Sequence, residues 1–118
     1  MKSIALRFFL LLNIFFIGCN GEEGVVKKSL SVTIKNTETY SHSFGVIGLE
    51  DSGAITTEPA HAIQSELVIN GDGYLVYTYQ PEVGYIGKDQ AIIEICFSRG
   101  DGKCYATEVN TIKFTVTD

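Results

Sequence analysis

Three cysteines are the residues of this chain whose spacing bears most directly on chemistry. Cys96 and Cys104 flank residues 98–102, Ser-Arg-Gly-Asp-Gly, a composition that favours a tight turn. A thiolate metal site would need further cysteine or histidine ligands nearby, and a redox pair would have Cys-x-x-Cys spacing. The pair therefore predicts a disulfide across a β-hairpin, provided that the chain reaches an oxidising compartment.

The third cysteine, Cys19, stands at the end of an apolar run that begins at Phe8. Lys2 and Arg7 precede this run, and Gly18 places a small residue directly before the cysteine. Positive charge, an apolar stretch and a small residue, in this order, are typical of an export signal. The run is shorter than the roughly 20 residues that a membrane-spanning helix needs. An ordinary secretory signal and a transmembrane anchor are the alternative interpretations.

Residues 1–23 resemble the signal segments of bacterial lipoproteins, with Ile17-Gly18-Cys19 at the position of the cleavage box. The resemblance implies that residues 1–18 are removed as a signal peptide. Cys19 would then become the N-terminus and carry a diacylglycerol, often with an additional amide-linked chain. Two or three acyl chains make a lasting membrane anchor, whereas one chain binds only marginally.

This resemblance also divides and places the chain. Residues 19–28 are expected to form a lipidated tether, and residues 29–118 a single domain. Glu22-Glu23 resembles the acidic export tags of some bacterial lipoproteins and favours the outer membrane over the inner one; a solvated linker is the alternative. The expected location is therefore the bacterial cell envelope, with the lipid as the contact to the membrane.

The charge of the remaining domain limits its partners. Without Lys2 and Arg7, seven basic residues would face 14 acidic ones, a net charge of −7. Nucleic-acid binding needs a basic surface that neutralises phosphates, so a nucleic-acid partner is not expected. Anionic lipid head groups should likewise repel the domain and keep it off the membrane surface.

A hairpin that brings the two cysteines together requires β-strands. The apolar residues from Ser29 onward recur with a period of two, which is typical of strands. Phe44 to Leu49 is interrupted by glycines and predicts a bulged strand. Asn70-Gly71-Asp72-Gly73 predicts a hairpin turn. The change of parity from Val109 to Ile112 predicts a second bulge. The alternating sets are Leu30, Val32, Ile34; Ile63, Leu67, Ile69; Leu75, Tyr77, Tyr79; Ala91, Ile93, Ile95, Phe97; and Ile112, Phe114, Val116.

About seven short strands with turn signals between them predict an all-β fold, an antiparallel β-sandwich, with a β-barrel as the alternative. Residues 70–116 resemble bacterial immunoglobulin-like and cadherin-like repeats. The likeness lies in 73–81 (GYLVYTYQP), 84–89 (GYIGKD), the Cys96–Cys104 hairpin and 112–116 (IKFTV). The resemblance implies an immunoglobulin-like sandwich. In the loop, Gly84 and Gly87 should supply unusual backbone angles, Tyr85 should pack into the end of the sandwich, and Asp89 should bind loop amides.

Other candidate site residues are few. Asp72, Asp89 and Asp101 are the candidates for calcium, but they fall in separate loops without an Asp-x-Asp-x-Asp-Gly run, so neither a metal nor a cofactor is expected. His42 and His61 are isolated, and no Gly-x-Ser-x-Gly elbow or phosphate loop is present, so enzymatic activity is not expected. The tyrosines expected to face outward and contact a ligand are Tyr40, Tyr74 and Tyr105.

These observations favour a non-catalytic envelope lipoprotein whose domain binds a protein partner or forms a structural subunit of an envelope assembly. A single copy of the domain makes a poor stalk and favours the subunit. The alternatives are a calcium-dependent adhesive module and a polysaccharide-binding surface module.

Overall fold

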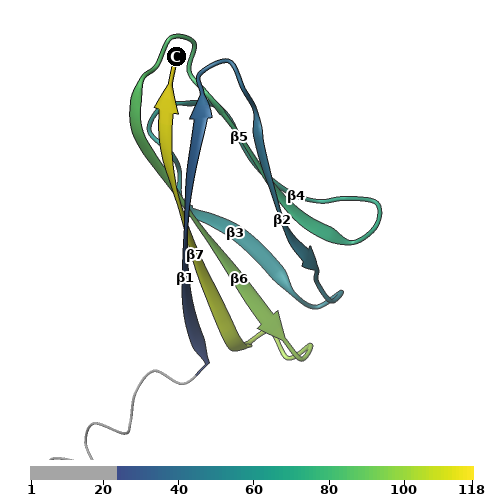
Figure 1. Ribbon diagram of the computed structural model, residues 1–118. Coiled ribbons are helices and arrows are strands. Elements are labelled where there is room, and N and C mark those ends of the chain that lie inside the picture. Colours follow the sequence, from purple (N-terminus) through teal and green to yellow (C-terminus); the bar gives the residue numbers. More distant parts are fainter. Residues whose placement is uncertain (1–23) are drawn as a thin grey trace, which may run out of the picture.

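The computed structural model describes residues 24–118, and within them it contains seven strands and no helix (Figure 1). The strands are β1 (Val25–Lys35), β2 (Tyr40–Val46), β3 (Ser52–Thr57), β4 (Ala62–Ile69), β5 (Tyr74–Pro81), β6 (Gly87–Ser98) and β7 (Cys104–Thr117). No helix among these residues is long and apolar enough to cross a membrane.

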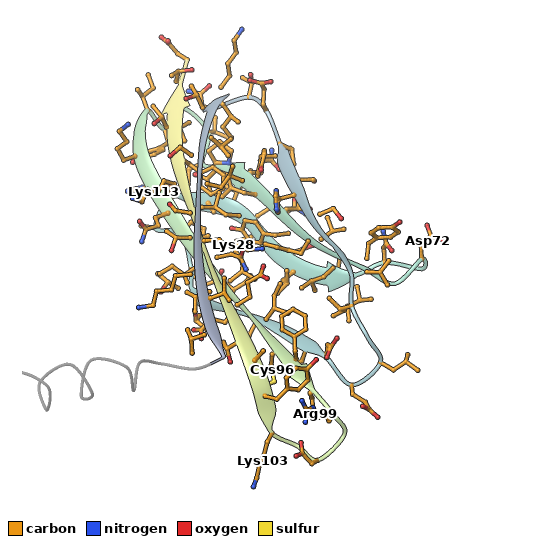
Figure 2. The ribbon with its side chains drawn as sticks, turned by 60° about the horizontal axis from the view of Figure 1, so that its bottom comes forward. Lys28, Asp72, Cys96, Arg99, Lys103 and Lys113 are labelled. Carbon is orange, nitrogen blue, oxygen red and sulfur yellow. A yellow bond between two sulfur atoms is a disulfide. The ribbon has the colours of Figure 1, made fainter. Side chains whose placement is uncertain are left out.

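The strands form two sheets, one ordered β1-β7-β6-β3 and the other β2-β5-β4. This confirms the predicted all-β, immunoglobulin-like sandwich and rules out the alternative of one closed barrel. One pairing departs from the antiparallel expectation, because β1 runs parallel to β7 along its whole length. The β4–β5 and β6–β7 hairpins diverge from each other in both views (Figures 1 and 2).

The core lies between the sheets and is built mainly from β5, β6 and β7. Alternate residues of these strands are buried, as the period of two predicts. The Tyr79 ring stacks on Phe114 with centroids 3.9 Å apart, which joins the two sheets at the centre. The cluster of buried residues consists of Tyr77, Tyr79, Ala91, Ile93, Ile112, Phe114 and Val116.

The predicted hairpin turn at 70–73 is confirmed. The Gly73 amide donates to the Asn70 carbonyl at 3.0 Å, and the Asn70 amide donates to the Tyr74 carbonyl at 2.9 Å. The predicted irregularity in the glycine-interrupted strand is also present, as a register shift between Ser43 and Val46 in β2. Gly45, inside this shift, has φ of +89°, which disfavours any side chain.

The predicted bulge near Asn110 is wrong. Strand β7 pairs with β6 without interruption from Thr107 to Val116. Asn110 simply occupies an inward position, where it is buried and its Nδ2 donates to the Ile93 carbonyl at 3.5 Å. A polar residue with a backbone partner thus continues the inward row that Ile112 begins.

The buried face predicted for Ile63, Leu67 and Ile69 is wrong for Ile63, and Ile69, at the end of β4, is 55% exposed. The register of β4 shifts between Ala62 and Gln64, and Ile63 inside this shift is 57% exposed. Leu67 does pack against the core. The shift changes which side of the sheet the following side chains face.

Strand β1 begins earlier than the expected domain boundary at Ser29. Residues 25–28, expected in the tether, pair with residues 107–110 of β7. The backbone amide of Thr107 donates to the Gly24 carbonyl at 2.6 Å and fixes the start of β1. Lys28 adds an ion pair with Glu108, with Nζ and Oε2 3.3 Å apart.

Candidate functional site

The predicted disulfide between Cys96 and Cys104 is confirmed, with a Cα–Cα distance of 5.3 Å that suits the bond. It crosses the β6–β7 hairpin near its tip, where Arg99 and Lys103 also lie (Figure 2). The Arg99 guanidinium stands 4.5 Å from the centre of the Tyr105 ring, a cation–π contact. The bond therefore stiffens a hairpin that carries exposed charged and aromatic groups.

Asp89 is the most heavily engaged carboxylate among the described residues. Its Oδ1 accepts from the Ala60 and Gln90 amides at 2.8 and 3.0 Å, and its Oδ2 accepts from the His61 amide at 3.0 Å. The Tyr79 hydroxyl donates to Oδ2 at 2.8 Å. Asp89 binds loop amides as predicted, but the loop is the one between β3 and β4 and not its own loop at residues 84–89. Asp89 also links β6 to β5 in the other sheet.

The calcium candidates do not come together. Asp89 is only 9% exposed and both of its oxygens accept hydrogen bonds from the protein. Asp72 lies in the exposed β4–β5 turn and Asp101 in the β6–β7 turn, where it accepts from the Lys103 amide at 3.0 Å. Residues 24–118 contain no group of three or more His, Cys, Asp or Glu side chains placed to hold a metal ion.

The two histidines contact tyrosines and a glutamate. His42 Nδ1 lies 3.2 Å from the Tyr40 hydroxyl. His61 stacks on Tyr85 with ring centroids 4.0 Å apart, and its Nδ1 lies 3.4 Å from Glu82 Oε1. Tyr85 packs into the end of the sandwich as predicted, where its hydroxyl donates to the Lys88 carbonyl.

The three candidate tyrosines do not form one surface. The outward orientation expected for Tyr40 is wrong, because its ring meets Phe114 edge-on at 5.8 Å and packs against the core. Burial raises the pKa of the Tyr40 hydroxyl accordingly. Tyr74 and Tyr105 are 41% and 54% exposed, but they lie at the diverging β4–β5 and β6–β7 hairpins. Parity or loop position in the sequence does not reveal that β2 begins at Tyr40.

Two fully buried tyrosines bind carboxylate or hydroxyl oxygens within the core. Burial is the main cause that raises the pKa of Tyr77 to about 12, while its hydrogen bond to Ser65, at 2.8 Å, opposes the rise. Burial also raises the pKa of Tyr79, and its bond to Asp89 adds to the effect. Both hydroxyls therefore stay protonated and act as donors or acceptors that fix the core.

The sequence missed a polar surface on the outer side of the four-stranded sheet, which we term the basic face. Lys27, Lys35, Lys88 and Lys113 all alternate with inward residues of their strands and are exposed. A hollow of about 550 Å³ lies beside Lys88 and Lys113. Its lining residues are Ser31, Lys88, Asp89, Gln90, Lys113, Phe114 and Thr115. Figure 2 shows Lys113 on this outer side, far from Lys103 at the hairpin tip.

A second, smaller crevice of about 170 Å³ opens between the two sheets beside β1 and β2. Phe44, Leu30 and Ile112 give it apolar walls, and Lys28 and His42 give it polar ones. The ion pair between Lys28 and Glu108 lies beside it. The crevice is the space left between the sheets next to the core.

Cys19, the expected lipidation site, lies outside the described residues. No protein-family model and no curated protein matches the chain. Among solved structures, the chain is similar to the cysteine protease inhibitor EhICP2 from Entamoeba histolytica, with 8% sequence identity and a TM-score of 0.47. The match covers 81% of this chain and 99% of the inhibitor chain. A similarity at this level says nothing about what this protein binds.

Proposed function

We propose that this protein is a non-catalytic lipoprotein of the bacterial cell envelope, anchored through Cys19, whose immunoglobulin-like domain serves an envelope assembly as a binding or structural subunit. The observation that carries the proposal is Gly18-Cys19 at the end of a charged and then apolar N-terminus. The outer membrane is the proposed location, because Glu22-Glu23 follows the lipidated cysteine.

The disulfide supports export. Cys96 and Cys104 are bonded in the structure, and such bonds persist in the periplasm and at the cell surface but rarely in the cytosol. With Cys19 assigned to the lipid, the chain keeps no free thiol. Only residues 20–24 separate Cys19 from β1, so the start of the domain would lie at most about 20 Å from the anchor.

The non-catalytic part of the proposal rests on the surroundings of the histidines. A hydrolytic site pairs a serine or cysteine with a base at hydrogen-bond distance. His42 instead contacts Tyr40, and His61 contacts Glu82 and Tyr85. Within residues 24–118, neither histidine hydrogen-bonds a serine or a cysteine, which supports a role in binding or assembly.

The proposal is tested by the intact mass of the protein purified from membranes of a bacterium that processes lipoproteins. We expect loss of residues 1–18 and a lipid-sized mass increment on Cys19. The Cys19→Ala variant should lose both the increment and the membrane association, whereas Asn20→Ala, one residue further along, should keep both. A wild-type protein with residues 1–18 removed and Cys19 unmodified would contradict the lipoprotein proposal.

A further inference from the structure

The basic face carries four lysines on one sheet surface of an acidic domain, and Glu94 lies in the same row as one of them, Lys27. The side chains that share this surface follow from the register. Ser31 and Gln90 flank Lys113 on the neighbouring strands, and Thr33 and Lys88 flank Thr115. Lys35 lies one row further, beside Thr117. Three successive rows therefore each present one lysine among hydroxyl and amide groups.

The lysines of these rows are available to a ligand. Within residues 24–118, none of the four lies within 4.0 Å of a carboxylate; the ion pairs there belong to Lys28 and His61. The Lys88 ammonium donates to Thr115 Oγ1 at 2.7 Å, which holds it over the sheet. Asp89 also lines the hollow, but its carboxylate is bound by interior donors. Glu94 shares the outer face further along β6, and Glu38 and Asp118 lie at its end.

The shape and chemistry of the basic face point to the class of partner. Its floor between Lys88 and Lys113 is made by short polar side chains such as Ser31 and Thr115. Cores of protein–protein interfaces are rich in aromatic and other apolar side chains, and no exposed aromatic lies here. Neighbouring strands are about 4.8 Å apart and alternate residues about 6.6 Å apart, so the Cα atoms of Lys88 and Lys113 are separated by about 8 Å. A flat, extended ligand with repeated carboxylates and hydroxyls complements such a surface.

We propose that the basic face binds an acidic polysaccharide, with Lys88 and Lys113 pairing its carboxylates and Ser31, Gln90 and Thr115 bonding its hydroxyls. This inference deepens the proposed function, because it names the partner class of the anchored domain. Anionic lipid is a less suitable source of the same charge. Ser31, which lies beside Lys113, is about 20 Å along β1 from Val25, the end next to the proposed anchor, and charges act over only about 8 Å in physiological salt.

The test measures binding of the full-length protein, in a neutral detergent, to immobilised polygalacturonate at about 50 mM salt. We expect binding that weakens as salt rises, and no binding to neutral dextran. The Lys88→Gln/Lys113→Gln double variant should bind about tenfold more weakly, because two exposed ion pairs are removed. Lys103→Gln at the hairpin tip removes a lysine charge elsewhere and should change binding less than about twofold.

Several results would overturn the inference. Wild-type protein that ignores polygalacturonate, or that loses as much binding from Lys103→Gln as from Lys88→Gln alone, would do so. So would vesicles of phosphatidylglycerol that bind the protein through Lys88 and Lys113 while polygalacturonate does not. Circular dichroism of each variant verifies that it folds. The assay does not depend on the lipid at Cys19, so its failure is distinguishable from failure of the lipoprotein proposal.

Discussion

Asp89→Asn should be the most damaging single conservative change in the domain. The substitution keeps the size of the side chain but turns one acceptor oxygen into an amide donor. At present Oδ2 accepts from the His61 amide at 3.0 Å and from the Tyr79 hydroxyl at 2.8 Å. The hydroxyl can rotate and accept from the new amide group, whereas the backbone N–H of His61 cannot. One part-buried donor therefore loses its partner, and the other bonds lose their charged acceptor.

The size of the effect follows from these contacts. A hydrogen bond to a charged group contributes about 1.5–3 kcal/mol, and an unsatisfied buried donor costs about 1–3 kcal/mol. Both figures describe in part the same lost contact, so they are not added in full. We expect Asp89→Asn to lower the free energy of unfolding by about 3 kcal/mol. For a domain of this size, 1 kcal/mol lowers Tm by about 4–8 °C, so Tm should fall by about 12–24 °C.

Thermal unfolding followed by circular dichroism, with urea titration at fixed temperature, measures this loss. Asp72→Asn is the matched control, since Asp72 lies in the exposed β4–β5 turn, and it should stay within about 0.5 kcal/mol of the wild type. Tyr79→Phe removes one of the four donors and should cost about 1 kcal/mol. An Asp89→Asn protein as stable as the Asp72→Asn protein would refute the assignment of Asp89 as the link between the loop and both sheets.

Two further predictions concern the ends and the core of the sandwich. Replacing both Cys96 and Cys104 by serine should lower the free energy of unfolding by about 2.5 kcal/mol, measured from the urea midpoint; an unchanged midpoint would argue against the bond in the native protein. Tyr77, with its pKa raised to about 12 by burial, keeps its proton where the unfolded chain, with a pKa of about 10, has lost it. Stability should therefore fall between pH about 10 and about 12, and Tyr77→Phe should reduce the slope of that fall in urea titrations; parallel slopes would contradict it.

The sequence predicts those strands whose inward residues are mainly apolar. Strands β5, β6 and β7 carry Leu75, Ile93 and Phe114 in rows that repeat every second residue, and the prediction failed where the polar Asn110 occupies such a row. The turns next to these strands can also be predicted from the local sequence. The glycines of the β4–β5 turn and the loop before β6 adopt positive φ at Gly73, Gly84 and Gly87, as their positions imply.

Strand β3 shows what such reasoning misses. Only Gly53 and Ile55 of this short strand face the interior, so no alternating apolar pattern marks it. Gly53 has a structural cause, since a Cβ there would lie 2.8 Å from Leu75 Cδ2. The side chain of Leu75, from β5 in the other sheet, fills the space that a side chain at position 53 would occupy. The strand therefore has a glycine where an apolar residue would have marked it in the sequence. The sequence of residues 25–28 likewise does not predict a strand. These residues of β1 are exposed at the edge of the sheet, and they form a strand because they pair with β7.

The basic face could not be found from the sequence because its members come from distant parts of the chain. Ser31, Lys88 and Lys113 become neighbours only through a parallel pairing of β1 with β7 and an antiparallel pairing of β7 with β6. The net charge of −7 expected for the mature chain describes the field far from the protein, where it opposes anionic partners. Within a Debye length of about 8 Å, a ligand instead meets the local charges. An acidic domain with a lysine-bearing sheet can therefore bind a flat polyanion on that sheet while its acidic loops repel the same ligand elsewhere, which fixes the side on which it docks.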